Sequence, residues 1–240
     1  MNLDPRYCFE PIGVIHSCFT ESFGIPRQAG LVPDARARLE FASRCAQADS
    51  VRGLEGFSHV WLLFVFHGEW GAPWSPLVRP PRLGGNERVG VFASRSPRRP
   101  NPIGLSAVKL LGIEQHGNSL ALELGGVDLL DGTPVLDVKP YVPYADAVAE
   151  AHAGYAAKAP QPKLRVEFSP QAQRQCDDYG ARYPNLAALI IQMLTLDPRP
   201  AYRADDDGGR TFGCRLLDLD VKWCVTGEAV TVLALEPIPV

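Results

Sequence analysis

Short apolar segments separated by turn-forming residues dominate the first half of the chain. Leu120, Leu122 and Leu124 alternate with other residues, and Ile12 and Val14 show the same spacing near the N-terminus. An apolar side chain at every second position is typical of a strand that buries one face. We therefore predict a strand in each of these two segments.

Three other apolar segments predict further strands. Residues 60–66 form an uninterrupted apolar run, which suits a strand buried on both faces, although the pattern alone also allows a buried helical segment. The segments 105–113 and 135–138 add more strands, and only 42–53 shows a helical pattern. Many short strands joined by glycine- and proline-containing turns indicate a β-sandwich or a β-barrel.

Asp131 and Gly132 lie between two apolar runs. An Asp-Gly pair in this position is a strong signal for a tight β-hairpin. We therefore expect the strands on either side of the pair to be joined as a hairpin. The turn conformation alone would then explain the presence of Asp131.

The composition changes at residues 145–162, an alanine-rich stretch that ends in prolines. Prolines at this point argue against a continuous helix and indicate a linker. The sequence therefore predicts two domains, at 1–150 and at 160–240.

The second domain has the pattern of a small α+β module. Ser169 followed by Pro170 predicts the start of a helix that runs to about Tyr183. A second helix is expected to begin after Asn185. Its apolar positions recur at intervals of three and four residues, at Leu186, Leu189, Ile190, Met193 and Leu194. A strand precedes the helices and three alternating segments follow them.

Composition narrows the location and the chemistry. The chain has 240 residues and a net charge of −3. It lacks an apolar run of membrane-spanning length, and its first residues lack the features of a signal peptide, so we expect a cytoplasmic protein without membrane attachment. Six cysteines without a CxxC pair and five histidines without an HExxH motif predict no metal site. The lack of a P-loop and of a GxGxxG sequence argues against a doubly wound nucleotide-binding domain.

Basic side chains are concentrated between residues 79 and 109. This stretch contains seven basic residues and one acidic residue, Glu87. Such a patch can bind phosphate groups, and a solvated basic loop explains the charge equally well. Within it, 94–104 combines three arginines with three prolines, which stiffen the chain. A rigid loop that presents guanidinium groups suits carboxylate or phosphate recognition, and a stiffened surface turn is the alternative.

Three further segments carry polar residues that say little one by one. Residues 25–30 have the pattern of an irregular polar loop. His67 follows an apolar strand, a place where a histidine is more often structural than catalytic. Residues 197–203 combine two prolines with two arginines and a tyrosine, which either end a helix or offer phosphate pairing and base stacking.

Taken together, these segments resemble one family. The strings IPRQAG, VRGLEGFSHVWLLFVFH, RSPRRPNPIG, GVDLLDGTPVLDVKPY and DPRPAYR occur in this order. They are similar to those of the TrmO (TsaA-like or YaeB-like) proteins in their long bacterial form. The resemblance implies a mainly β fold, with a single-sheeted β-barrel that binds S-adenosylmethionine and a small α+β C-terminal domain. It also implies a homodimer with its site near the subunit interface. The implied activity is methylation of N6 in threonylcarbamoyl-adenosine at position 37 of threonine tRNA.

The resemblance implies a cofactor site built from several segments. Arg95 or Arg27 would hold the carboxylate of S-adenosylmethionine by a charge-assisted pair. Leu105 and Leu129 would sandwich its adenine ring. The residues implied to bind the cofactor are Pro26, Arg27, Gln28, His67, Gly68, Arg95, Leu105, Leu129, Leu130, Asp131 and Gly132.

Catalytic and substrate-binding roles follow from the same resemblance. His67 and Asp131 are the candidate catalytic residues, as acceptors of the N6 proton, although either could simply hold the cofactor. Arg99 would pair with the threonyl carboxylate of the substrate, and no role is assigned to Arg98. The residues implied to bind tRNA are Arg99, Asp197, Arg199, Tyr202 and Arg203.

Two other functions stay open at this point. The barrel could bind the cofactor or an anion as a sensor without catalysis, or the protein could methylate a protein or a small metabolite. Methyl transfer to tRNA would exclude the sensor. Removal of the second domain would test the other substrates, because only a large RNA substrate should need that domain.

Overall fold

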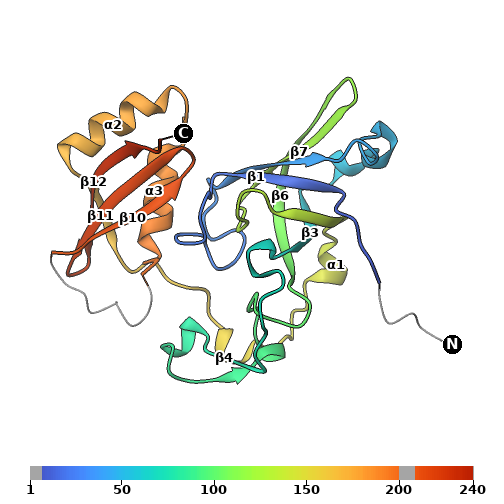
Figure 1. Ribbon diagram of the computed structural model, residues 1–240, viewed down its shortest axis with the longest axis horizontal. Coiled ribbons are helices and arrows are strands. Elements are labelled where there is room, and N and C mark those ends of the chain that lie inside the picture. Colours follow the sequence, from blue (N-terminus) through green and yellow to red (C-terminus); the bar gives the residue numbers. More distant parts are fainter. Residues whose placement is uncertain (1–6, 200–208, 240) are drawn as a thin grey trace.

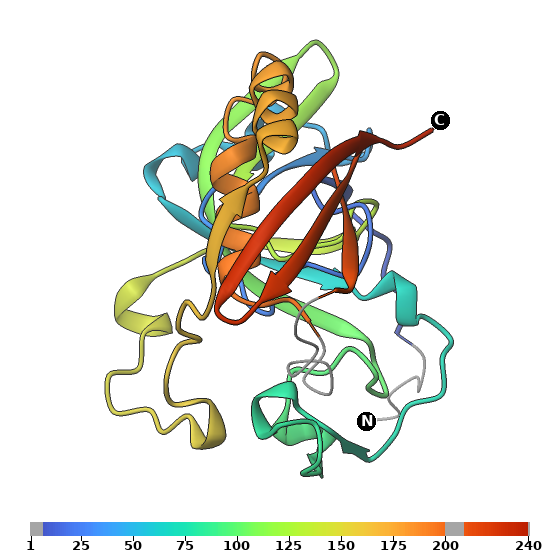
Figure 2. The same cartoon turned by 90° about the vertical axis from the view of Figure 1, so that its left-hand side faces the viewer.

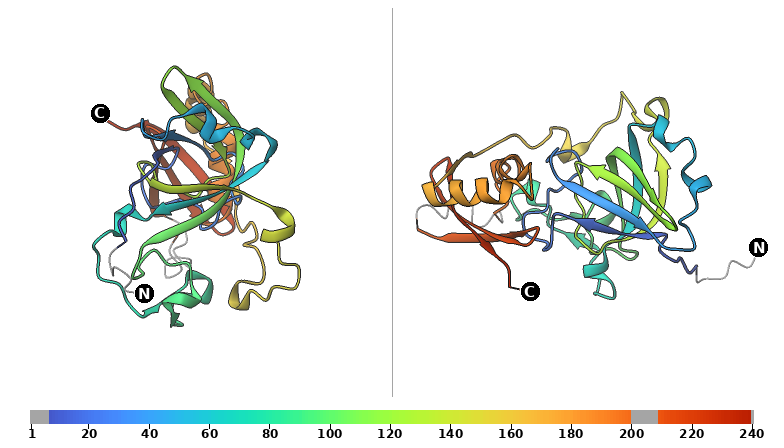
Figure 3. Two further views of the ribbon diagram at one scale, coloured as in Figure 1. Left: turned by 90° about the vertical axis from the view of Figure 1, so that its right-hand side faces the viewer. Right: turned by 90° about the horizontal axis from the view of Figure 1, so that it is seen from above.

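The computed structural model describes residues 7–199 and 209–239, and it contains a β-barrel and a smaller α+β unit that lie side by side (Figure 1, Figure 3). This confirms the predicted fold class, a mainly β chain whose barrel precedes an α+β unit. None of the described helices is long and apolar enough to cross a lipid bilayer. The elements are β1 (Gly13–Ser17), β2 (Arg36–Phe41), β3 (His59–Val65), β4 (Leu77–Val78), β5 (Val89–Gly90), β6 (Ile103–His116), β7 (Ser119–Gly125), β8 (Pro134–Pro140), α1 (Pro143–Asp146), β9 (Arg165–Phe168), α2 (Pro170–Gly180), α3 (Leu186–Thr195), β10 (Thr211–Leu216), β11 (Leu219–Thr226) and β12 (Ala229–Pro237).

Strands of the described chain close the barrel in the order β1-β2-β7-β6-β3-β8, and neighbouring strands are antiparallel. The strand predicted at β7 is confirmed and its three leucines are fully buried, but Ala121 between two of them is fully buried as well. On β3 one face is buried and the other is half-buried. The prediction that β3 is buried on both faces, made from its continuous apolar run, therefore overstated the burial of this strand. Trp61, on the outer face of β3, packs against Tyr141 with 5.6 Å between ring centroids.

Two local predictions for the barrel are wrong. Residues 42–53 form turns and the 3-10 helix Ala48–Val51 instead of an α-helix; of that short helix only Val51 is buried, so no apolar face supports a longer one. Asp131 and Gly132 do not form a hairpin turn, because β7 and β8 on either side of them are not neighbours in the barrel. β7 pairs with β6 and β2, whereas β8 pairs with β1 and β3.

The second unit is a sheet in the order β10-β11-β12-β9, with α2 and α3 packed against it (Figure 2). Ser169 caps α2 as predicted, and its hydroxyl accepts a hydrogen bond from the Ala172 amide at 3.0 Å. The five predicted apolar positions of α3 are all buried. Asn185 precedes α3 but does not cap it. Its side-chain amide donates instead to the Asp34 carboxylate of the barrel, at 3.2 Å.

The barrel and the second unit share one hydrophobic core. Phe19, just after β1, forms an isolated bridge with Leu216 of β10. Gln192 of α3 binds Asp34, just before β2, at two points: it accepts from the Asp34 amide at 3.0 Å and donates to the Asp34 carboxylate at 2.6 Å. The long segment between β1 and β2 is therefore attached to the second unit near both of its ends.

Three cysteines lie in the core of the molecule. All six cysteines are free, and Cys18, Cys176 and Cys214 are buried. Burial raises the pKa of the Cys18 thiol to about 11 and that of Cys214 to about 12. The Cys18 and Cys214 thiols are therefore neutral packing groups.

A close contact fixes the start of β6 against the end of β3. Gly104 lies opposite Phe64 in the register of this pair. The Phe64 ring covers Gly104 so tightly that a Cβ at residue 104 would overlap the ring. The same ring meets Phe66 edge-on, with 5.1 Å between centroids. The packing sets where β3 ends and β6 begins, and residues of the predicted site lie at both places.

We expect Gly104→Ala to lower the free energy of unfolding by about 1–3 kcal/mol, the usual cost of overpacking a core, because the Phe64 ring must move. Urea unfolding followed by fluorescence measures this change. Gly56→Ala is the matched control, since a Cβ at residue 56 would meet nothing within 4 Å. Equal stability of the two variants would contradict the role given to this contact.

Candidate functional site

The antiparallel order of the barrel brings several loops to one end. Arg36, at the start of β2, lies opposite Gly125 at the end of β7, and Val65, at the end of β3, lies opposite Ile103 at the start of β6. The loops after β1, β3 and β7 and the loop before β6 therefore open at the same end. Their predicted cofactor residues are Pro26, Arg27 and Gln28 after β1, His67 and Gly68 after β3, Arg95 before β6, and Leu129, Leu130, Asp131 and Gly132 after β7.

His67 lies beside the turn formed by Leu129–Gly132. A Cβ at residue 132 would be 4.0 Å from Nε2 of His67. The backbone of Gly132 is left-handed, with a φ of 77°, which glycine adopts without steric cost. The turn and the imidazole thus border a surface where a flat ligand group meets no side chain from residue 132.

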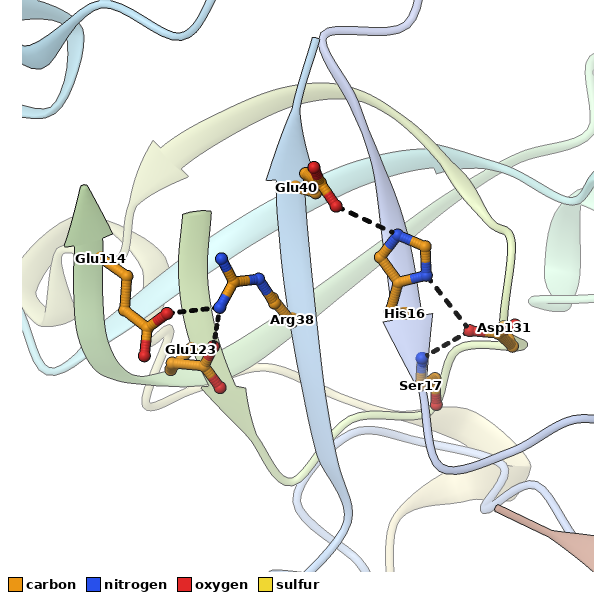
Figure 4. Close-up of polar contacts among 7 residues, drawn as sticks. All are labelled: His16, Ser17, Arg38, Glu40, Glu114, Glu123 and Asp131. Carbon is orange, nitrogen blue, oxygen red and sulfur yellow. Dashed lines mark hydrogen bonds and ion pairs between the residues drawn. The ribbon is translucent and has the colours of Figure 1, made fainter. Parts of the chain in front are cut away.

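The Asp131 carboxylate points toward β1 (Figure 4). Its Oδ1 accepts a hydrogen bond from the Ser17 amide at 2.8 Å. The backbone of the turn adds two bonds of 2.8 Å, from the Asp131 amide to the Phe19 carbonyl and from the Gly132 amide to the Ile15 carbonyl. Asp131 therefore fastens the turn to β1, across the seam where the barrel closes.

Two groups of polar side chains lie on neighbouring strands beside this carboxylate (Figure 4). The His16 ring lies 3.9 Å from it through Nδ1 and 3.5 Å from the Glu40 carboxylate through Nε2. On the neighbouring strand, Arg38 pairs with Glu114 and Glu123 of the β6–β7 hairpin. These side chains are about one third to one half exposed, so each pair contributes little to stability. Together they connect the strands whose loops carry the candidate site.

Arg95 and Gln28 meet across the site. The Arg95 guanidinium donates a hydrogen bond to Oε1 of Gln28, although 67 positions separate them in the sequence. Burial lowers the pKa of the neighbouring Arg27, and Arg82 acts in the same direction, whereas Asp197 opposes the shift. This end of the barrel therefore gathers cationic side chains, a setting that suits an anionic ligand group.

The two leucines expected to sandwich an adenine ring lie in different surroundings. Leu105 on β6 is 52% exposed, whereas Leu129 is 1% exposed and lies in the core. Leu105 can offer its side chain to a ligand, whereas Leu129 is buried in the described structure. The predicted sandwich of two side chains is therefore not formed by this arrangement.

The arginine-rich loop before β6 is held by its own contacts. Nε of Arg98 pairs with the Glu69 carboxylate at 3.0 Å. Arg99 is half-buried and donates to the Ser94 carbonyl at 3.3 Å. Arg95 is the member of this loop that lies with the predicted cofactor residues, while Arg98 is bound to the adjacent loop.

The predicted tRNA residues Asp197 and Arg199 form a closed pair after α3. Arg199 donates to both carboxylate oxygens of Asp197, at 2.8 and 3.0 Å, and is only 6% exposed. The backbone of Asp197 is left-handed, with a φ of 53°. Burial favours a role of Arg199 in shaping this segment over direct contact with a phosphate. Tyr202 and Arg203 lie outside the described residues.

Comparison with known families covers most of the chain. The N-terminal domain of tRNA-methyltransferase O matches residues 14–147, and the TrmO C-terminal domain matches residues 161–238.

The chain belongs to the tRNA-methyltransferase O family.

Several relatives of this TrmO-family chain align with it over most of both chains. The chain is 50% identical over 229 residues to a tRNA (adenine(37)-N6)-methyltransferase of Escherichia coli (strain K12), which covers 95% of this chain and 97% of the relative. It is 54% identical over 214 residues to a Pseudomonas aeruginosa protein named as an S-adenosylmethionine-dependent methyltransferase, RcsF, covering 89% and 90% of the two chains. A crystal structure of TrmO from Pseudomonas aeruginosa superimposes with a TM-score of 0.80 at 46% identity, covering 96% and 98%. The family resemblance of the motifs is therefore confirmed.

Asp128 is a residue at this end of the TrmO-family barrel that the sequence reasoning missed. Its Oδ1 is buried and has no hydrogen-bond partner among the described residues. The signal that could have found it is the pair of aspartates in the string VDLLDG. Only Asp131 drew attention, because Asp-Gly has a recognised turn pattern.

If Asp131 serves mainly to fasten the turn, Asp131→Ala should lower the free energy of unfolding by about 0.5–1.5 kcal/mol, for one lost hydrogen bond. Asp131→Asn keeps an acceptor and should lose less. Methyl transfer by Asp131→Asn at saturating cofactor should stay close to the wild-type rate. A rate loss of about a hundredfold at unchanged stability would identify Asp131 as the proton acceptor instead.

Proposed function

We propose that this chain transfers the methyl group of S-adenosylmethionine to N6 of threonylcarbamoyl-adenosine at position 37 of threonine tRNA. The observation that carries the proposal is the convergence of 26–28, His67, Arg95 and Leu129–Gly132 at one end of the barrel. The TrmO family and the relative named as a tRNA (adenine(37)-N6)-methyltransferase support both the cofactor and the class of substrate.

The residues at this end suit S-adenosylmethionine. Arg95 and Arg27 supply positive charge for the carboxylate of its amino-acid part. The space beside Gly132 and His67 suits the flat adenine. When bound, the cofactor supplies a methyl group on a positively charged sulfur, and a neutral thioether leaves.

The target nitrogen explains what the protein has to contribute. N6 is attached to a carbonyl group in this nucleoside, so its lone pair is delocalised and it is a weak nucleophile. We propose that Arg99 pairs with the threonyl carboxylate and holds N6 in line with the departing sulfur, because orientation alone can supply several kcal/mol. His67 is the better candidate for accepting the N6 proton, since Oδ1 of Asp131 is already bonded to the Ser17 amide.

We assign cofactor binding to residues 1–150 and tRNA binding to residues 160–240, with 197–203 as the segment nearest the reaction. The Asp197 carboxylate favours the charged form of Arg27. The start of that segment therefore lies close to the loop at residues 25–30. In this proposal Arg199 shapes the segment, and Tyr202 and Arg203 contact the RNA. We propose the cytoplasm as the location of this reaction, because tRNA is the proposed substrate.

The substrate is tested with threonine tRNA that carries or lacks the threonylcarbamoyl group, incubated with labelled cofactor and digested to nucleosides for mass analysis. We expect methylated threonylcarbamoyl-adenosine from the modified tRNA and no product from the unmodified one. Equal methylation of both, or a methyl group on another nucleotide, would refute the substrate. Cofactor binding without transfer to any tRNA would favour the sensor function.

A homodimer is the second part of the proposal. The loops next to the site, together with β4 and the start of β6, expose large apolar side chains, which one chain leaves uncovered and a second copy could bury. Two of them are very exposed, Phe92 at 77% and Trp70 at 70%. The whole set is Trp70, Trp74, Leu77, Phe92, Ile103 and Leu105.

We expect the double variant Trp70→Ser and Phe92→Ser to sediment as a monomer under conditions where the wild type sediments as a dimer, because both removed groups belong to this apolar set. Analytical ultracentrifugation provides the measurement. Tyr144→Ser is the control, since Tyr144 is 93% exposed but lies on α1, outside these loops. An unchanged sedimentation coefficient in the double variant would place the interface elsewhere.

A further inference from the structure

Asp128 lies where the β7 strand has ended and the turn has not yet begun. Two residues earlier, the Gly126 carbonyl accepts a hydrogen bond from the Gly30 amide at 2.7 Å. The segment that contains Asp128 is therefore packed directly against the loop at 25–30. Its carboxyl group is placed between this loop, the start of β6 and the closing turn of the barrel.

The carboxyl group is not satisfied by the protein alone. The Ser106 hydroxyl and the Ala29 amide approach it and favour its ionised form, but burial has the larger effect and raises the pKa of Asp128. Oδ1 remains buried without a hydrogen-bond partner among the described residues. A buried acceptor without a donor costs free energy, so folding alone does not explain why this position carries an acid.

A cation lies within electrostatic reach of this acid. The positive charge of Arg95 favours the ionised form of Asp128. The Arg95 guanidinium, however, donates a hydrogen bond to Gln28. One region of the site thus presents an acid and a guanidinium close together without an ion pair between them in the described structure. An α-amino acid carries the complementary charges, an ammonium and a carboxylate attached to the same carbon.

We propose that Asp128 binds the α-ammonium group of the cofactor's amino-acid end while Arg95 binds the α-carboxylate. The inference rests on the proposed function and specifies how that site recognises S-adenosylmethionine. The ammonium group supplies the hydrogen-bond donor that Oδ1 lacks. Its positive charge also favours the ionised form of the acid, which burial otherwise opposes.

Three ligands distinguish the contribution of the ammonium group from that of the carboxylate. S-adenosylhomocysteine carries both the ammonium and the carboxylate, decarboxylated S-adenosylmethionine keeps the amine alone, and 5′-methylthioadenosine has neither. Measured by titration calorimetry, Asp128→Asn should weaken the first two by about tenfold to a hundredfold and leave the third unchanged. Arg95→Ala should weaken S-adenosylhomocysteine alone.

Further variants guard against a general loss of structure. Asp128→Ser is tested beside Asp128→Asn, so that the result does not depend on one variant. Asp49→Asn is the matched control, because it removes a surface carboxylate that pairs with Arg52. Thermal unfolding without ligand gives a second distinction. Neutral asparagine should keep or raise the midpoint, because a buried charge is costly, whereas loss of a purely structural carboxylate would lower it.

Equal weakening of all three ligands by Asp128→Asn would show that Asp128 only supports the loop, and it would overturn the proposal. Unchanged binding of all three would overturn it as well. A wild type that binds none of the ligands would overturn the cofactor part of the proposed function, and the Asp128 assignment with it. Normal ligand binding without methylation of tRNA would fault the substrate alone.

Discussion

Closure of the barrel between β1 and β8 is the constraint on which the candidate site depends. The ladder between these strands has only two residue pairs. The turn Leu129–Gly132 extends the seam, through the Asp131 carboxylate bound to the Ser17 amide and through two backbone bonds. The same turn borders His67. One short stretch therefore closes the barrel and forms a wall of the site, so its geometry cannot change for one purpose without affecting the other.

The second unit extends this constraint to residues 25–30, the candidate cofactor loop. The segment between β1 and β2 is bound to that unit near Phe19 and again at Asp34, and the cofactor loop lies between these two points. Between them, a Cβ at Gly24 would come within 3.2 Å of the Met193 sulfur of α3. The second unit thus supports the cofactor loop in addition to its proposed contact with tRNA. A loop held from both units needs less ordering when a ligand binds, which favours affinity.

Elements whose signals are local could be predicted from the sequence, and those set by distant partners could not. The Ser169 cap and the apolar face of α3 depend only on neighbouring residues. β2 was not predicted, because Ala37 and Leu39 are too few apolar positions to mark a strand that barrel closure creates. The hairpin expected at Asp131 failed because strand order, not turn chemistry, decides which strands pair. The site residues came from family motifs, and Asp128 escaped notice because its neighbours come from three distant segments.

Two ionisable groups of the candidate site lie in surroundings that disfavour their charged forms, and the folded structure does not compensate for this. Burial raises the pKa of Asp128, and burial together with Arg82 lowers the pKa of Arg27, so each group is held in surroundings that disfavour its charged form. Groups that only served stability would be paired or replaced by apolar residues of similar size. A ligand with both an anionic and a cationic group relieves both strains at once, and it binds the folded chain alone, so it must also stabilise the fold. Unfavourable charges that one zwitterion can neutralise are thus better explained by ligand binding than by packing.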